Sequence, residues 1–371
     1  MIKLDNVTKV YPDGTEAVKE ASFEVEEGEL CVLLGPSGCG KTTTMKMINR
    51  LIPITGGTIY INGVDNTKMD ENELRRNIGY AIQEIGLFPH MTVGQNIETV
   101  PTLKGWPKDK RSKRAEELLE LVGMDSADFM DKYPSELSGG QRQRVGVARA
   151  LGADPPILLM DEPFGAIDPI TRVRLQDEFL KIQREIKKTI IFVTHDIYEA
   201  IKMGDKIALM NEGRLVQYDT PANLLYRPKN EFVEDFVGTD RALKGLQLIR
   251  VREVMTGSPP TVRPDDKVEA ARVRMERDGI DWLVVVNDDG KLLGWIDKAG
   301  LGKGEMVREV MKSSTVTVTI DAVLNEALSL MLSSRVNTLV VVDGDNRLQG
   351  ALSLDAIQKT LGEATQRGKT E

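Results

Sequence analysis

The sequence contains very few cysteines and histidines. Its 371 residues include two of each, with the cysteines at Cys31 and Cys39. So few cysteines exclude a disulfide framework, which indicates a reducing compartment. Two histidines cannot by themselves build a metal cage, so no structural metal is expected.

Long apolar runs are also missing. No apolar stretch approaches the roughly 18 residues that a membrane-spanning helix needs. The first residues, MIKLDNVTKVYPDG, lack the apolar segment of a secretory signal. Any association with a membrane is therefore expected to go through a partner. The formal net charge of −8 gives no bulk electrostatic support for nucleic-acid binding, so no nucleic-acid partner is expected.

Residues 1–238 carry the pattern of an α/β domain. Short apolar runs at Leu30–Leu34, Ile157–Met160 and Ile190–Val193 alternate with helical stretches. Such continuous apolar runs are typical of strands that are buried on both faces of a parallel sheet. The segment of about 86–154 has helical patterns and little strand signal, which predicts a helical subdomain inserted in the α/β core.

An internal repeat occupies the last third of the chain. VREVM at 251–255 recurs at 307–311, and LVVV at 283–286 recurs at 339–342, so each pair lies 56 residues apart. Each unit is predicted to hold a helix and two short strands, and one unit is too small to bury much core, so the two should pack together. The expected boundaries are 239–250 for a linker, 251–306 and 307–361 for the repeats, and 362–371 for a flexible tail.

A phosphate-binding loop is predicted at residues 35–42, GPSGCGKT, which match G-x-x-x-x-G-K-[ST] between an apolar strand and a helix. Glycines let backbone N–H groups surround phosphate oxygens at a helix start. Lys41 is expected to reach the β- and γ-phosphates, and Thr42 to offer its hydroxyl to Mg²⁺. Cys39 occupies a variable position and is expected to pack. The loop residues expected around the nucleotide are Gly35, Ser37, Gly38, Cys39, Gly40, Lys41, Thr42 and Thr43.

Two acids follow the apolar run Ile157–Met160. A strand that delivers Asp161 and Glu162 at its carboxyl end places them at the ligand crevice of an α/β sheet. Asp161 is expected to orient Mg²⁺ and its waters. Glu162, one residue further, is expected to act as the base that polarises the attacking water.

The stretch Leu137–Gln141, LSGGQ, resembles the signature of the ABC ATPase family, and the resemblance extends over residues 1–238. It implies an α/β P-loop ABC ATPase domain with an inserted helical subdomain, followed by an α+β tandem CBS domain pair. A hydroxyl and bare N–H groups at a helix start also form an anion site. The family implies that this site serves the ATP bound to a second copy. The resemblance assigns signature contacts to Ser138, Gly139, Gly140 and Gln141, adenine stacking to Tyr11, a Mg²⁺-linked glutamine to Gln83, the D-loop to Asp168 and the γ-phosphate switch to His195.

The resemblance narrows to ATP-binding subunits of quaternary-amine importers through residues 45–51 (MKMINRL), 83–91 (QEIGLFPHM), 163–169 (PFGAIDP) and the repeat. It implies a homodimer that uses ATP and Mg²⁺ on the cytoplasmic face of transmembrane permease subunits, served indirectly by an extracytoplasmic substrate-binding protein. The apolar surface Glu84–Met91 is expected to dock the permease. The alternatives are a motor for another small solute and a soluble ABC ATPase that acts as a mechanical clamp.

The repeats resemble a pair of CBS domains, which often bind adenosine-containing ligands. The second repeat has the usual ribose contacts, Ser353 and Asp355, whereas the first has Asp297 and Ala299 there. A regulatory ligand such as cyclic di-AMP, ATP or AMP is one expectation. A purely dimerising module and a sensor of ionic strength remain alternatives.

Overall fold

The computed structural model describes residues 1–82, 86–165, 167–257, 259–313 and 316–367. The chain divides into two compact units. The first comprises Met1–Leu224 and Pro228–Phe236, and the second comprises Leu225–Arg227 and Val237–Glu371.

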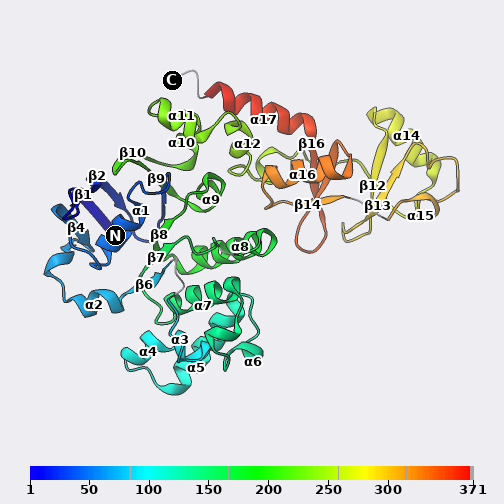
Figure 1. The fold of residues 1–371 in the computed structure, drawn as a ribbon. Helices are drawn as coiled ribbons and strands as arrows, with labels where there is room; N and C mark the ends of the chain where they lie inside the picture. Colours follow the sequence, from blue (N-terminus) through cyan, green and yellow to red (C-terminus); the bar gives the residue numbers. More distant parts are fainter. Residues whose placement is uncertain (83–85, 166, 258, 314–315, 368–371) are drawn as a thin grey trace. The chain divides into compact units, whose positions relative to one another are not determined.

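The first unit contains two sheets (Figure 1). A four-stranded antiparallel sheet has the order β2-β1-β4-β5, and a six-stranded sheet has the order β10-β9-β3-β8-β7-β6. All neighbours in the larger sheet are parallel except β10 and β9. The strands are β1 (Ile2–Val10), β2 (Glu16–Val25), β3 (Leu30–Leu34), β4 (Gly56–Ile61), β5 (Val64–Asp65), β6 (Ile78–Ala81), β7 (Ile157–Asp161), β8 (Thr189–Val193), β9 (Lys206–Asn211) and β10 (Arg214–Asp219).

The apolar runs of the sequence form the centre of the larger sheet. Every residue of β3, β7 and β8 is buried, because strands covered on both faces must be apolar throughout. The predicted strands at these three places are therefore confirmed. Leu33 pairs with Val193, and Asp161 also pairs with Val193, so the carboxyl ends of β3, β7 and β8 lie level at one edge.

The described residues between β6 and β7 form helices and no strand, as the predicted helical insertion requires. Figure 1 shows these helices gathered at the β6 edge of the larger sheet. Gly79 of β6 permits this approach, because an added Cβ would lie 2.2 Å from the carbonyl oxygen of Ala150. The helices of this part of the chain are α1 (Lys41–Ile48), η1 (Asn66–Lys68), α2 (Glu71–Arg76), α3 (Val93–Ile97), α4 (Thr99–Leu103), α5 (Lys108–Leu121), α6 (Ser126–Phe129), η2 (Pro134–Glu136), α7 (Gly139–Leu151), α8 (Pro169–Ile186), α9 (Ile197–Met203), α10 (Pro221–Tyr226) and α11 (Glu231–Val237).

The second unit repeats one fold with the 56-residue offset of the sequence. Its sheets have the orders β11-β12-β13 and β14-β15-β16, and each has one parallel and one antiparallel pairing. The register shift between Val285 and Val286 recurs between Val341 and Val342. The elements are α12 (Arg241–Gly245), α13 (Val251–Val254), β11 (Thr261–Val262), α14 (Val268–Asp278), β12 (Trp282–Val286), β13 (Leu292–Asp297), α15 (Val307–Val310), β14 (Thr317–Thr319), α16 (Leu324–Ser334), β15 (Thr338–Val342), β16 (Leu348–Ser353) and α17 (Leu354–Arg367).

The two repeats pack together through reciprocal contacts, as their small size predicts. Arg252 pairs with Asp321 at 3.1 Å, and the equivalent Arg308 pairs with Asp265 at 2.9 Å. A shared apolar cluster lies between the sheets and includes Val284, Leu292, Val340 and Val342. The same surface of each repeat therefore faces the other, as in a twofold interface.

The short first helix of each repeat packs into the core of the other. Val251 of α13 is fully buried among residues of the second repeat, and Val307 of α15 is fully buried among residues of the first. Each hydrophobic core therefore contains residues from both sequence repeats, 251–306 and 307–361.

The structure has helical residues in both the expected linker and the expected tail. The expected linker 239–250 contains α12, whose Lys244 and Gly245 are buried. The expected tail 362–371 begins inside α17, which continues to Arg367.

Candidate functional site

The loop after β3 is shaped by its glycines. Gly35 and Gly40 have φ of +145° and +103°, and an added Cβ would lie 2.1 Å from the carbonyl oxygen of Met210 and 2.4 Å from that of Ala17, respectively. No other residue fits these positions, because both the backbone conformation and the space exclude a side chain. The loop then begins α1 at its N-cap, Gly40.

Lys41 lies folded over this loop. Its ammonium group donates hydrogen bonds to the carbonyl oxygens of Gly35 (2.6 Å) and Pro36 (2.8 Å), and the residue is buried. The Cys39 sulfur lies 3.7 Å from the same ammonium. Burial raises the pKa of the Cys39 thiol, which keeps it protonated and suits the predicted packing role.

Thr42 and Asp161 meet at the carboxyl edge of the sheet. The Thr42 hydroxyl donates to Oδ1 of Asp161 at 3.2 Å, and Asp161 is 3% exposed. Burial raises the pKa of Asp161 above its ordinary value, and the Thr42 hydrogen bond opposes this rise. A hydroxyl beside a desolvated carboxylate is an oxygen donor set that suits a hard cation such as Mg²⁺.

Glu162 and His195 form the second polar pair of this edge. Oε1 of Glu162 lies 2.9 Å from Nδ1 of His195. The Glu162 N–H donates to the carbonyl oxygen of Val193 (3.0 Å), which places the carboxyl group beside the end of β8. His195 lies two residues beyond that strand end, and its side chain is 63% exposed. The imidazole therefore reaches solvent beside the carboxylate.

The predicted signature forms the start of α7. The Ser138 hydroxyl accepts from the N–H of Gln141 (3.2 Å), and the Gln141 side chain accepts from the N–H of Ser138 (2.8 Å). This reciprocal capping box fixes the first turn of the helix, in which Gly139 and Gly140 present no side chain. Gln143, which the sequence analysis did not single out, donates to the carbonyl oxygen of Glu162 at 2.8 Å.

The other residues that the sequence predicted for the nucleotide site lie in different segments of the chain. Tyr11 lies between β1 and β2, with the Lys9 ammonium 5.2 Å from its ring centroid. Asp168 is the N-cap of α8 and accepts from the N–H of Thr171 at 3.0 Å. Hydrogen bonds from Thr171 lower the pKa of Asp168. Gln83 lies outside the described residues.

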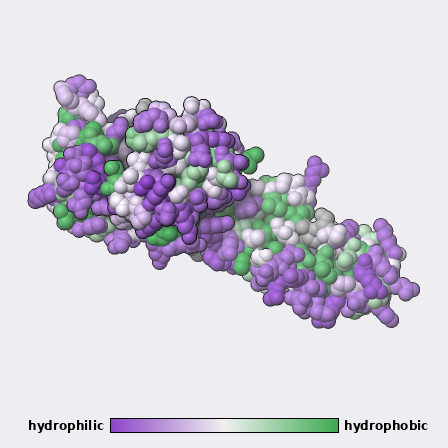
Figure 2. Space-filling view, turned by 90° about the horizontal axis from the view of Figure 1, so that it is seen from below, coloured by the Kyte–Doolittle hydropathy of each residue, from purple (hydrophilic) through white to green (hydrophobic). Residues whose placement is uncertain are grey.

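The described helices and the surface drawn in Figure 2 bear on contact with a membrane. Among the residues that the structure describes, no helix has both the length and the apolar character to cross a bilayer. On the face drawn in Figure 2, hydrophilic side chains predominate, and hydrophobic ones form small separate patches.

Two family models match the chain. The model described as ABC transporter matches residues 18–165, and the model described as CBS domain matches residues 251–301 and 307–363. The glycine betaine/carnitine/choline transport ATP-binding protein of Bacillus subtilis is 48% identical over 95% of this chain and 94% of its own length. The chain belongs to the ATP-binding subunits of quaternary-amine ABC importers. Proteins of this family are ATPases coupled to transport, and they act on ATP with Mg²⁺.

Other relatives agree with this family. The osmoprotectant import ATP-binding protein of Salmonella typhimurium is 46% identical over 99% of this chain and 98% of its own length. A solved dimeric ATP-binding cassette with bound ADP and phosphate is 36% identical and covers 60% of this chain and 99% of its own, with a TM-score of 0.56. The α/β ATPase domain and tandem CBS pair expected from the sequence are thus confirmed.

The positions that the sequence analysis named for ribose contacts differ between the two CBS repeats. In the second repeat, the Ser353 hydroxyl accepts from the N–H of Ala356 (3.2 Å), and Asp355 is exposed in the first turn of α17. In the first repeat, Asp297 replaces the serine and pairs with Lys312 at 2.5 Å. The Lys312 hydrogen bond holds the pKa of Asp297 below its usual range. The carboxylate at this position of the first repeat is therefore engaged in an internal ion pair.

Proposed function

We propose that this chain is the ATP-hydrolysing subunit of an importer for compatible solutes of the glycine betaine, carnitine and choline type. The names of its relatives in Bacillus subtilis and Salmonella typhimurium, as transporters of glycine betaine, carnitine and choline and as an osmoprotectant importer, support this solute class. The observation that carries the enzymatic part is the Glu162–His195 pair, which lies at the same sheet edge as Thr42 and Asp161.

Each of these groups has a distinct task in the proposed reaction. Lys41 leaves its loop carbonyls to bind the β- and γ-phosphates. Thr42 and Asp161 would hold Mg²⁺, which would supply positive charge beside the phosphates. Glu162 accepts a proton from the attacking water. His195, hydrogen-bonded to Glu162, orients that carboxylate and contacts the γ-phosphate. Tyr11 stacks on adenine, while Gln83 links the Mg²⁺ site to the helical subdomain.

A second copy completes the site in this proposal. Ser138, Gly139 and Gly140 present a helix N-terminus to the ATP of the partner copy, where the positive helix dipole favours phosphate. Asp168 belongs to the same interface. The homodimer works on the cytoplasmic face of permease subunits, which receive solute from an extracytoplasmic binding protein.

The proposed permease contact is the segment Glu84–Met91, of which Glu84 and Ile85 lie outside the described residues. Phe88 is 40% exposed, although it is a large apolar side chain. The side chain of the buried Asn96 forms hydrogen bonds with the backbone of this loop. It accepts from the Phe88 N–H (2.8 Å) and donates to the carbonyl oxygens of Phe88 (3.2 Å) and Met91 (3.1 Å). An exposed aromatic residue on a hydrogen-bonded loop is suited to anchor a partner. Co-purification with a multi-span membrane protein distinguishes this importer from a soluble mechanical clamp.

Replacement of Glu162 by glutamine tests the enzymatic proposal. We expect Glu162→Gln to bind ATP as the parent does and to lose nearly all turnover, because an amide keeps the shape but cannot take a proton. The variant should accumulate as an ATP-bound dimer, measured by size-exclusion chromatography with ATP present. Near-normal steady-state hydrolysis would overturn the assignment of Glu162 as the base.

The CBS pair is proposed to regulate transport by binding an adenine nucleotide, with cyclic di-AMP as the first candidate. The second half-site supports this, since an ionised Asp355 can accept hydrogen bonds from two ribose hydroxyls. A salt sensor at a membrane surface is less favoured, because Arg272 and Arg277 of α14 pair with Glu269 and Asp278. Titration of the full chain with cyclic di-AMP should show binding that Asp355→Ala weakens and Asp289→Ala, an exposed acid in the first repeat, leaves unchanged. Equal binding by both variants would contradict the ribose contact.

A further inference from the structure

The backbone of Glu162 adopts a conformation that glutamate rarely takes. Its φ is +46°, in the left-handed region. For a residue with a Cβ, this conformation costs roughly 1–2 kcal/mol. Such a residue persists only where its surroundings hold it, and it is common at functional sites. The carboxylate of Glu162 is therefore held near His195 by the contacts of its own peptide groups.

Hydrogen bonds with Val193, Gly165 and Gln143 hold those peptide groups. The Glu162 N–H donates to Val193 at the end of β8, and the Glu162 carbonyl oxygen accepts from the N–H of Gly165 at 3.1 Å. The same carbonyl oxygen accepts from the side-chain amide of Gln143 at 2.8 Å. The contact from Gln143 is the only one of these three that comes from a helix of the inserted subdomain.

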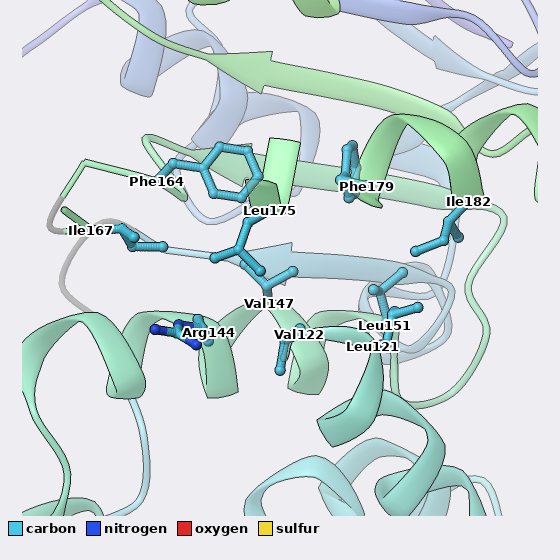
Figure 3. Close-up of a pocket in the computed structure, with 10 residues that line it drawn as sticks. All are labelled: Leu121, Val122, Arg144, Val147, Leu151, Phe164, Ile167, Leu175, Phe179 and Ile182. Atoms are coloured by element: carbon cyan, nitrogen blue, oxygen red, sulfur yellow. The ribbon is translucent and has the colours of Figure 1, made fainter. Parts of the chain in front are cut away.

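Gln143 is buried on α7. It is 7% exposed, and it shares one face of α7 with Val147 and Leu151, at spacings of one and two helical turns. Those two side chains line an apolar cavity with Phe164 and Phe179, which Figure 3 shows between α7 and the segments that lead to and form α8. Apolar surroundings strengthen this hydrogen bond and make an unpaired partner costly.

We propose that Gln143 is a positioning residue for hydrolysis, which ties the signature helix to the backbone of Glu162. The inference rests on the proposed role of Glu162 as the base. Gln143 lies five residues after Ser138 on the same helix, roughly 7–8 Å along its axis. A shift of α7, when its N-terminus engages the nucleotide of the partner copy, is thereby transmitted to the peptide group that sets the direction of the catalytic carboxylate.

The first test replaces Gln143 by methionine, which keeps the volume and removes the donor. We expect kcat for ATP hydrolysis to fall by roughly 10- to 100-fold, because small misplacements of a reacting group have effects of this size. The dissociation constant for ATP should stay near that of the parent. In the Glu162→Gln background, Gln143→Met should cause no further loss, since it acts through Glu162.

Gln183→Met is the matched control. Gln183 is also a buried glutamine, but its amide bonds to Gly28 (3.1 Å) and Lys188, before the start of β8. It should lower thermal stability without lowering kcat. A parent-like kcat for Gln143→Met, while Glu162→Gln is inactive, would overturn this inference and leave the proposed function standing. Normal hydrolysis by Glu162→Gln would overturn both.

Gln143→Glu provides a second readout that a packing defect would not produce. An ionised carboxylate cannot donate to the Glu162 carbonyl oxygen, whereas a protonated one can, and burial raises the pKa of such a carboxyl. The ratio of the variant's kcat to the parent's should therefore rise as the pH falls from about 8 to about 6. A ratio that stays flat over this range would contradict the donor role.

Discussion

The backbone at Gly40 sets the shape of the phosphate-binding loop at the scale of a single residue. Gly40→Ala would place a Cβ 2.4 Å from the carbonyl oxygen of Ala17, whereas a Cβ at Gly38 would meet nothing within 4 Å. We expect Gly38→Ala to cost about 1–2 kcal/mol through its positive φ alone and Gly40→Ala to cost more and to abolish ATP binding. Thermal unfolding and nucleotide titration measure both. Equal loss of stability would contradict the steric argument.

Asp161, a proposed Mg²⁺ ligand, is buried at a cost to stability when it is ionised. Burial raises the pKa of Asp161 in the folded protein. A carboxyl with a raised folded pKa contributes stability below its unfolded pKa, and this contribution is lost as the pH rises through the folded pKa. Without Mg²⁺, ionisation of Asp161 is therefore expected to lower the stability of the fold.

We accordingly expect Asp161→Asn to unfold at a higher temperature than the parent at neutral pH, by roughly 2–4 °C per kcal/mol gained. The difference should vanish on acidification below the ordinary aspartate range. Addition of ATP and Mg²⁺ should stabilise the parent but not the variant, which should not hydrolyse ATP. A variant that is less stable than the parent at neutral pH would show that the Thr42 hydrogen bond outweighs burial.

Helix α7 connects the proposed signature site at its N-terminus with the proposed catalytic residue Glu162. Its first turn is closed by Ser138 and Gln141, and Gln143 touches the peptide group of Glu162. A helix with both contacts can transmit a movement of its N-terminus to the peptide group of Glu162 in the same chain.

Ser138→Arg tests the composite site that this element is proposed to form. We expect no hydrolysis, because a large cation blocks the phosphate site at the helix start. A mixture of Ser138→Arg with Lys41→Ala chains should regain activity, since a heterodimer holds one intact site. The phosphate-release rate of the mixture, compared with each variant alone, gives the answer. An inactive mixture with demonstrated heterodimers would require a site within one chain.

At the scale of the whole molecule, the nucleotide residues and the CBS pair lie in different compact units. Each described residue of the proposed ATP site lies before residue 200, within the first unit. We expect a chain that ends at Gly238 to bind and hydrolyse ATP at close to the parent rate. The same truncation should remove any response of transport to cyclic di-AMP in reconstituted vesicles. Loss of basal hydrolysis in a folded truncated chain would give the second unit a catalytic part.

The sequence by itself determined the ATPase fold and the tandem CBS pair. Fully buried parallel strands must be apolar throughout, so Leu30–Leu34 was recognisable as a strand. A loop that surrounds phosphate needs glycines and a lysine in fixed order, so the sequence predicts this role for Lys41 and Thr42. The 56-residue repeat was visible because two copies of one fold need the same side chains at equivalent places.

Only the tertiary structure decided the contacts between segments that lie far apart in the chain. The hydrogen bond from Gln143 to Glu162 depends on how α7 packs against the strand end of β7, which no local pattern records. The exchange of Val251 and Val307 between the two repeat cores likewise depends on the twofold arrangement of the pair. The spacing of side chains in the sequence determines which face of a helix or strand is apolar. The packing of the whole unit determines which other element covers that face.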